Sequence, residues 1–236
     1  MTDVTSGVPS PGGPPIALWI PVVLAAVAGY VDAIGFLEIF GVFPANQSGN
    51  AILIGIAAGH FEWIAFWPPA VSILSFGVGV ALAVRVALRV RAAIQVEVLL
   101  ALEIVLLVAF AIWVPFTPTG TVPVHFPIGA GLMVLAASSM GVQTYAVHLT
   151  AGIQVVTTYQ TGAIVQVAQA LATPPERTQT NQHPLLKVLC FVFVAYLVGA
   201  ALGAAAGELG RTSISVACVP LALILIARFI SRRAIR

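Results

Sequence analysis

The residues best suited to chemistry in this chain of 236 residues stand in two short polar stretches within otherwise apolar sequence. The first reads "NQSGN" over residues 46–50 and follows an acidic side chain, Asp32, in the apolar run before it. The second reads "TTYQTG" over residues 157–162 and follows a polar cluster, "QTYAVH", at 143–148. A helix that starts at such a stretch offers free N–H groups to an anion or a carbonyl, while bare carbonyls suit a cation or water. The pattern predicts a binding site for a small polar ligand.

The composition places these stretches inside a membrane protein. Hydrophobic residues make up 60% of the chain and charged residues 8%, and the mean hydropathy is +1.05. These values exclude a water-soluble globule of this length. Residues 1–15 contain no Lys or Arg and are rich in Pro and Gly, so they are expected to form a disordered tail rather than a signal peptide.

Helix-breaking residues accompany the first polar stretch. Pro44 and Gly49 both interrupt helices. Ser48 and Asn50 are natural capping residues for a helix that begins near Ala51. Irregular backbone at membrane depth is tolerated only where it is buried in protein or lines water. We therefore expect this stretch inside the bundle, where the alternative to ligand binding is that its side chains only cap helices and hold them together.

Pairing the two halves of the chain defines one expected cavity. Asp32 shares a small-residue face with Ala25 and Gly29, so it should point into the bundle rather than at lipid. Thr144 and His148 occupy the corresponding face in the second half. The expected substrate-binding residues are Asp32, Ser48, Gly49, Asn50, Gln143, Thr144, Tyr145, His148, Thr158, Thr161 and Gly162.

Enzymatic and nucleic-acid functions find little support. The chain has no HExxH motif, no phosphate loop and no Ser-His-Asp set in a recognisable context. Cys190 and Cys218 lie in apolar runs without metal-ligand spacing, so neither a metal site, a cofactor nor a disulfide frame is predicted. The basic residues read as interfacial anchors and not as a nucleic-acid patch. An intramembrane enzyme using Asp32 and His148 is the remaining catalytic alternative.

Apolar runs near the length of a membrane span occur eight times. Two of them carry many polar residues, which makes them unsuited to a helix that faces lipid; these are 41–66 and 153–172. The eight runs cover residues 16–37, 41–66, 69–90, 95–115, 126–149, 153–172, 185–207 and 211–230.

The distribution of positive charge decides how many runs cross. If all eight cross, four of the ten basic residues, the three at 85–91 and Arg211, lie on one side and six lie on the other. If the run 153–172 returns to its own side, nine lie together and only Arg211 is opposite. Cytoplasmic loops collect Lys and Arg, so the second arrangement is favoured. It places the basic segment 231–236 in the cytoplasm, and both termini lie there if the run 41–66 also returns to its own side.

An internal repeat indicates that the run 41–66 also returns to its own side of the membrane. Gly29 precedes "SGNAILIG" as Gly141 precedes "TGAIVQVA", at nearly the same spacing. The chain is therefore predicted to be an all-α polytopic membrane protein of two inverted repeats, 16–115 and 126–230. It would have about six transmembrane helices and two short broken or re-entrant helices, a plan that recurs in transporters. The alternative is that 41–66 is an ordinary tilted span and the repeat an accident of low complexity.

The motif pair "GYVDAIGFL" and "VFPANQSGNAILIG", with "GVQTYAV" and "VVTTYQTGAI" in the second half, resembles the YoaK-like family of bacterial inner-membrane proteins, a domain of unknown function. The resemblance covers nearly the whole chain after the tail. It departs at "ANQSGN", where a Met-Thr-Gly-Asn-like run is expected, and at "TGAI", where Thr-Gly-Thr is usual. It implies a multi-pass protein of the bacterial plasma membrane and adds no catalytic role.

These features favour a secondary transporter or channel-like carrier of a small polar solute or ion, with its site between the two broken helices. No Lys or Arg in the spans can face Asp32, so this acid is expected to be protonated or shared at neutral pH and to couple transport to protons. The rival is a non-transporting assembly or sensory protein. Membrane lipid is the expected partner, and three glycines at 199, 203 and 207 suit packing within the bundle or, alternatively, a homo-oligomer.

Overall fold

The computed structural model describes residues 19–39, 41–117, 126–151, 164–165, 168, 172 and 182–234. In these residues the chain forms α-helices and short 3-10 helices, and no strand occurs among them. The α-helices are α1 (Trp19–Glu38), α2 (Gln47–Gly59), α3 (Trp63–Arg89), α4 (Gln95–Trp113), α5 (Phe126–Ala151), α7 (Gln182–Gly207) and α8 (Cys218–Ala234). The 3-10 helices are η1 (Ala92–Ile94), η2 (Val114–Phe116) and η5 (Arg211–Ala217).

Six helical stretches in the described part of the chain are long and apolar enough to cross a membrane. They correspond to α1, α3, α4, α5, α7 and α8, some of them extended by the adjoining 3-10 turns. Helix α2 has 13 residues, which is too short to span a hydrocarbon core of about 30 Å. The prediction of an all-helical, multi-pass protein with six spans is therefore confirmed.

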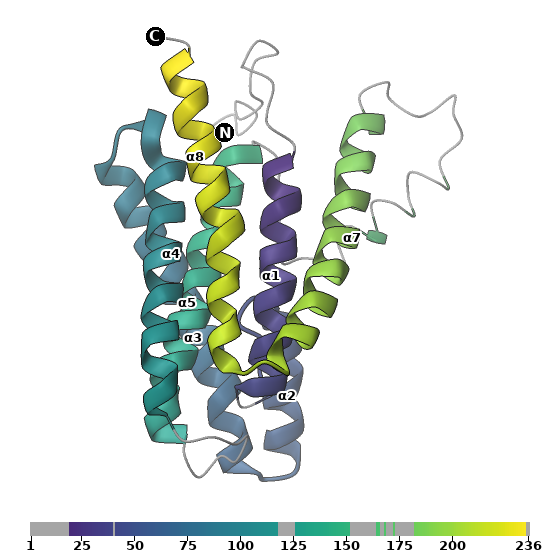
Figure 1. Ribbon diagram of the computed structural model, residues 1–236. Helices are drawn as coiled ribbons and strands as arrows, with labels where there is room; N and C mark the ends of the chain where they lie inside the picture. The colour runs from purple at the N-terminus through teal and green to yellow at the C-terminus, as the bar shows by residue number, and fades with distance from the viewer. Residues whose placement is uncertain are drawn as a thin grey trace, which may run out of the picture.

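The spans alternate in direction along one common axis (Figure 1). Helices α1, α4 and α7 run from the end where α8 finishes, and α3, α5 and α8 run the opposite way. Helix α2 continues in the direction of α1 and forms a hairpin with the first half of α3. The run 41–66 is thus not one continuous helix, because a turn at 41–46 and a left-handed residue, Phe61 (φ 58°), interrupt it.

Helices α1 and α7 pack backbone to backbone. A Cβ atom added at Gly29 would clash with the carbonyl of Tyr196, and one added at Gly199 would clash with the carbonyl of Ala26. Glycine permits this approach because it carries no side chain. The glycine-rich stretch of α7 is therefore used for packing within the chain.

Helices α3 and α5 make a second contact of the same kind. A Cβ at Gly79 would clash with the carbonyl of Ser138, and one at Gly141 would clash with the carbonyl of Phe76. The hydroxyl of Ser138 also donates a hydrogen bond of 3.0 Å to the carbonyl of Ser75. Close glycine contacts thus fix two pairs of helices, α1 with α7 and α3 with α5.

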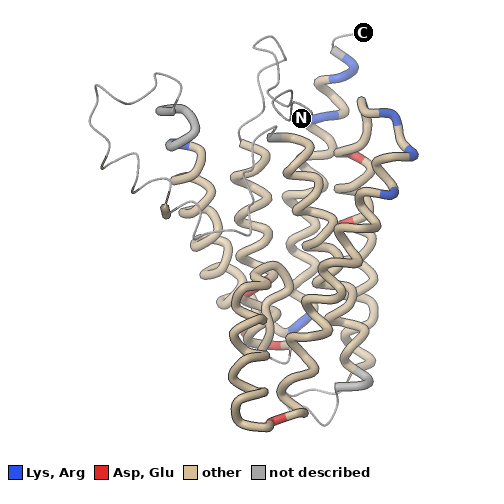
Figure 2. Tube along the Cα trace, turned by 180° about the vertical axis from the view of Figure 1, so that it is seen from behind, with Lys and Arg blue, Asp and Glu red and all other residues tan. Residues whose placement is uncertain are grey.

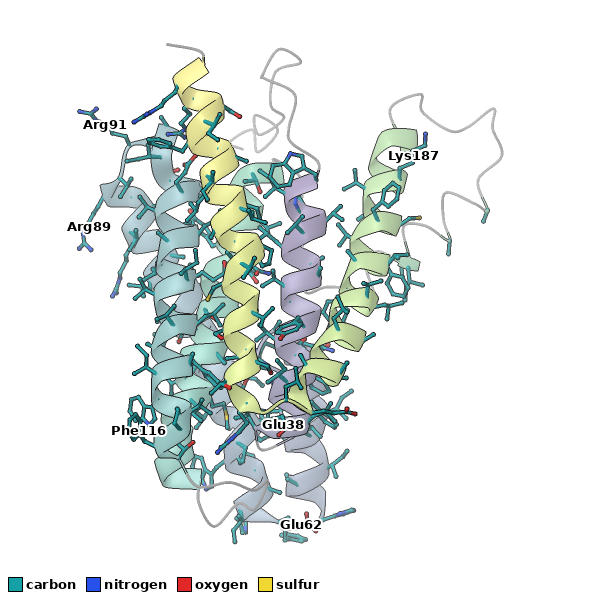
Figure 3. The ribbon with its side chains drawn as sticks, viewed as in Figure 1. Glu38, Glu62, Arg89, Arg91, Phe116 and Lys187 are labelled. Atoms are coloured by element: carbon teal, nitrogen blue, oxygen red, sulfur yellow. The ribbon has the colours of Figure 1, made fainter. Side chains whose placement is uncertain are left out.

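Positive charge gathers at one end of the bundle (Figure 2). Arg89, Arg91 and Lys187 lie at this end, while Glu38 and Glu62 lie toward the other (Figure 3). The carboxylate of Glu97, at the start of α4, pairs here with two arginines of α8, Arg228 at 2.7 Å and Arg232 at 3.0 Å. Basic residues gathered at one end of a helical bundle are typical of an interface between membrane and water.

The glycine contacts can be tested by two substitutions on α3. Gly79→Ala places a methyl group against backbone and should lower the free energy of unfolding by about 1–3 kcal/mol. Gly77→Ala meets nothing within 4 Å, so it should be neutral or stabilise the helix by up to about 1 kcal/mol. Thermal unfolding in detergent compares the two. Equal melting temperatures would show that α3 and α5 do not approach as described.

Candidate functional site

The side chain of Asn46 caps the start of α2. Its Oδ1 accepts hydrogen bonds from the N–H of Gly49 at 3.3 Å and from the hydroxyl of Ser48 at 2.7 Å. Asn46 is therefore the N-cap of a helix that begins at Gln47. The expectation that Ser48 and Asn50 cap a helix starting near Ala51 is wrong, because the earlier amide takes the capping position and both residues lie within the helix.

Asn50 instead locks the turn that precedes α2. It is fully buried (0% exposed). Its Oδ1 accepts from the N–H of Phe43 at 2.9 Å, and its Nδ2 donates to the carbonyl of the same residue at 2.6 Å. Nδ2 also lies 2.9 Å from Gln47 Oε1 and 3.0 Å from the hydroxyl oxygen of Ser72 on α3. The amide thus satisfies both backbone groups of Phe43, which would otherwise be costly to bury.

Asp32 joins three segments of the chain. Asp32 lies within α1, and it is buried (2% exposed). Oδ1 accepts from the N–H of Ala45 at 2.6 Å and from the N–H of Asn46 at 3.3 Å, and Oδ2 accepts from the hydroxyl of Tyr196 on α7 at 2.6 Å. We call Asp32, Tyr196 and the two amides of Ala45 and Asn46 the carboxylate cluster.

The carboxylate cluster places the start of α2 inside the bundle. Asp32 stands six residues before the last residue of α1, Glu38, which corresponds to about 9 Å along the axis. The chain therefore turns back after α1 before α2 begins. Gly35 makes room for this return, because a Cβ there would clash with the ring of Pro44. A helix N-terminus with its positive dipole end consequently lies beside a buried acid.

The chemistry of the carboxylate cluster is that of an acid held by neutral donors. The three hydrogen bonds to Asp32 come from two backbone amides and a phenol. An ionised carboxylate accepts all three, whereas a protonated one gains a donor and is a weaker acceptor. Protonation of Asp32 therefore weakens the contacts that join α1 to the turn before α2 and to α7.

The polar residues of α5 do not join this cluster. Gln143 is fully buried, and its Nε2 donates to the carbonyl of Leu24 on α1 at 2.9 Å. Leu24 precedes Asp32 by eight residues, or about 12 Å along the helix axis. The hydroxyl of Thr144 bonds within its own helix, to the carbonyl of Met140 at 2.8 Å.

The remaining predicted residues fall into two groups. The ring of Tyr145 stacks on that of His148 at 6.1 Å between centroids, and His148 is exposed. Thr158, Thr161 and Gly162 lie outside the described residues. Of the predicted set, the structure thus gathers Asp32, Ser48, Gly49 and Asn50 around the start of α2.

Two side chains of this region were not among the predicted site residues. Tyr196 donates to Asp32 across 164 residues of sequence, and Ser72 bonds both Asn50 and the carbonyl of Phe43. A phenol in the apolar run "FVFVAYLVGAALG" was the available signal for Tyr196, since a buried Tyr hydroxyl usually finds a partner.

The helices that carry this region match the family model described as Protein of unknown function (DUF1275), over residues 20–227. The chain belongs to this family. It is also similar to the UPF0700 transmembrane protein YoaK of Bacillus subtilis (strain 168), with 28% identity over 152 residues. That match covers 63% of this chain and 64% of the relative, so it spans less than two thirds of the relative's length. No solved structure matches the chain. The resemblance to the YoaK-like family is thereby confirmed.

The hydrogen bond from Tyr196 can be removed without altering its ring. In this DUF1275 protein, Tyr196→Phe leaves Oδ2 of the buried Asp32 without its donor and should destabilise the fold by about 1–3 kcal/mol. Tyr145→Phe is the matched control, since its ring contact with His148 remains, and should change stability by about 0.5 kcal/mol or less. Thermal unfolding in detergent measures both. Equal effects would contradict the geometry of the carboxylate cluster.

Proposed function

We propose that the protein is a secondary transporter or channel-like carrier of a small polar solute or ion, coupled to protons through Asp32. The carboxylate cluster carries this proposal. An ionisable residue within a membrane span is costly and is typically found in ion and proton pathways. Transporters commonly use the free N–H groups of a broken helix to bind substrate oxygens. Both features meet at the start of α2.

The coupling follows from competition for the same amides. Ionised Asp32 occupies the N–H groups of Ala45 and Asn46, where a carbonyl or anionic oxygen of a solute would otherwise bind. Protonation weakens this hold and leaves the amides available to the solute. Proton and solute binding then favour one another, which is the condition for symport.

An inverted repeat, which we propose as the basis of alternating access, is supported by the glycine contacts. Gly29 of α1 approaches the carbonyl of Tyr196 on α7, and Gly141 of α5 approaches the carbonyl of Phe76 on α3. The spacing is 112 residues from Gly29 to Gly141 and 120 from Phe76 to Tyr196. Helices α1 and α5 run in opposite directions, as do α3 and α7 (Figure 1). Residues at equivalent positions therefore make equivalent contacts in the two halves, and the helices of one half run opposite to those of the other.

A second pair of contacts obeys the same spacing. Ser138 follows Ala26 by 112 residues and Gly199 follows Gly79 by 120, and Gly79 approaches Ser138 as Gly199 approaches Ala26. Two contacts with identical offsets argue against an accident of low complexity.

The proposed repeat also predicts that the coupling group occurs once. At the offset of 112 residues, the counterpart of Asp32 is Thr144, and at 120 the counterpart of Tyr196 is Phe76. Neither counterpart titrates near neutral pH. One proton site of this type per chain is therefore expected.

The alternative is a non-transporting assembly or sensory protein. It is favoured by one observation, that the polar atoms of Asn50 are fully used in holding the turn before α2. Flux into proteoliposomes with a panel of polar solutes and ions separates the two proposals, because only a carrier moves solute across the bilayer.

The orientation that we propose places the basic end of the bundle in the cytoplasm. In a variant without its two native cysteines, Ser231→Cys at the end of α8 should react with an impermeant maleimide only from the cytoplasmic side. Glu62→Cys, between α2 and α3, should react only from the outside. Labelling of both positions from one side would exclude a six-span path, and the reversed pattern would exclude this orientation.

Asp32→Asn tests the coupling. The amide oxygen can still accept from Ala45 and Asn46, and the amide nitrogen can donate to Tyr196, so the variant should fold while losing pH-dependent flux. Asp32→Glu should retain part of the dependence, and Glu97→Gln at the bundle end is the control carboxylate. Wild-type pH dependence in Asp32→Asn would refute coupling through this residue. Failure of Asp32→Asn to fold would assign Asp32 a structural role instead.

A further inference from the structure

A second acid lies inside the bundle at a position that would suit an apolar residue. Glu103 falls on the core-facing stripe of α4 and is 0% exposed. The stripe continues through Leu99, Leu100, Leu107 and Phe110, each of which is also 0% exposed. Helix α4 packs this side of the bundle against α5, α8 and η5.

Both carboxyl oxygens of Glu103 lack a hydrogen-bond partner among the described residues. Two other acids of the spans differ in this respect. Glu97, six residues earlier on the same helix, pairs with Arg228 and Arg232, and Asp32 accepts three hydrogen bonds. An ionised carboxylate without any partner is the most costly group to place in an apolar interior.

In the part of the chain that the structure describes, the titratable groups on the elements around Glu103 provide no countercharge. Helix α8 contributes the thiol of Cys218, which lies within electrostatic reach of the acid. From η5 comes Arg211, whose guanidinium bonds the carbonyl and hydroxyl of Thr117 beyond the end of α4. Helix α5 has no titratable side chain from 129 to 144.

The remaining neighbour, α3, carries its cations at its end. Arg85 and Arg89 are both exposed. Two neighbouring elements do supply further buried oxygens that lack partners among the described residues, Gln143 Oε1 on α5 and Ser213 Oγ on η5. Among the described residues, the surroundings of Glu103 therefore offer no cation to an ionised carboxylate.

The element next to Glu103 has an unusual backbone. Segment η5 is a 3-10 helix of seven residues that leads directly into Cys218. Runs of 3-10 helix longer than three or four residues are uncommon, although shorter 3-10 turns are frequent as connectors. Segment η5 connects α7 to α8 and contacts α4.

We propose that Glu103 is a second internal proton-binding site, which holds a neutral carboxylic acid between α4, α5 and α8 and exchanges its proton with water. The site is distinct from the carboxylate cluster, because it contacts neither the turn before α2 nor α7 through hydrogen bonds among the described residues. A role in solute flux rests on the proposed function, whereas the bound proton does not.

Infrared spectroscopy of the whole protein in lipid tests the site directly. The wild type at neutral pH should show the carbonyl band of a protonated carboxylic acid, and Glu103→Met should remove it. The band should shift when H₂O is replaced by D₂O, because the proton exchanges. Identical spectra for wild type and Glu103→Met overturn the proposal, and so does a band that is insensitive to D₂O, which would identify an inert buried acid.

Substitutions of the other two acids test whether the infrared band belongs to Glu103. Glu97→Gln removes a carboxylate that is paired with arginine and should leave the band unchanged, and Asp32→Asn should not remove the component assigned to Glu103. Glu103→Met should fold because it conserves volume in an apolar stripe, and its failure to fold would contradict the apolar environment. Glu103→Gln serves as a second variant for comparing infrared spectra with the wild type. A missing solute flux with the band present would refute transport and leave the proton site intact.

Discussion

The structure depends on one constraint, that backbone N–H and C=O groups inside a membrane must find partners within the protein. The chain breaks its helical path between α1 and α2 in the interior of the bundle, where Ala45 and Asp32 are buried. Asp32 accepts the amides of Ala45 and Asn46, and Asn50 pairs with both backbone groups of Phe43. The polar residues near the break are therefore required by the break itself. A ligand bound at the start of α2 would compete for the same groups.

Close packing brings the partners of these groups into place. The contact of Gly29 with the backbone of Tyr196 lies less than one turn of α1 from Asp32, so the phenol reaches the carboxylate at hydrogen-bond distance. Helix α3, held to α5 by Gly79, presents Ser72 to Asn50. The small residues thus act on the candidate site indirectly. They set the distance between helices and leave the hydrogen bonds to the polar side chains.

The parts of this arrangement that could be predicted are those encoded by local pattern. Hydropathy and the distribution of Arg and Lys indicate six spans, and a small-residue face indicates that Asp32 points inward. Pro44 and the polar run after it indicate a broken element. The partner of Asp32 could not be predicted, because Tyr196 meets it only through the packing of α1 on α7. The capping residue was misassigned since Asn46 and Asn50 are equally suited by type, and only the path of the turn decides between them.

The two buried acids show why a proton at one site has a different consequence from a proton at the other. Asp32 connects α1, the turn before α2 and α7, so a change in its charge alters contacts between segments that could move relative to one another. Glu103 has no hydrogen bond to lose among the described residues, and its neutral form is the one that its apolar surroundings tolerate. Proton binding at Glu103 can therefore change the charge of the interior without directly breaking a contact.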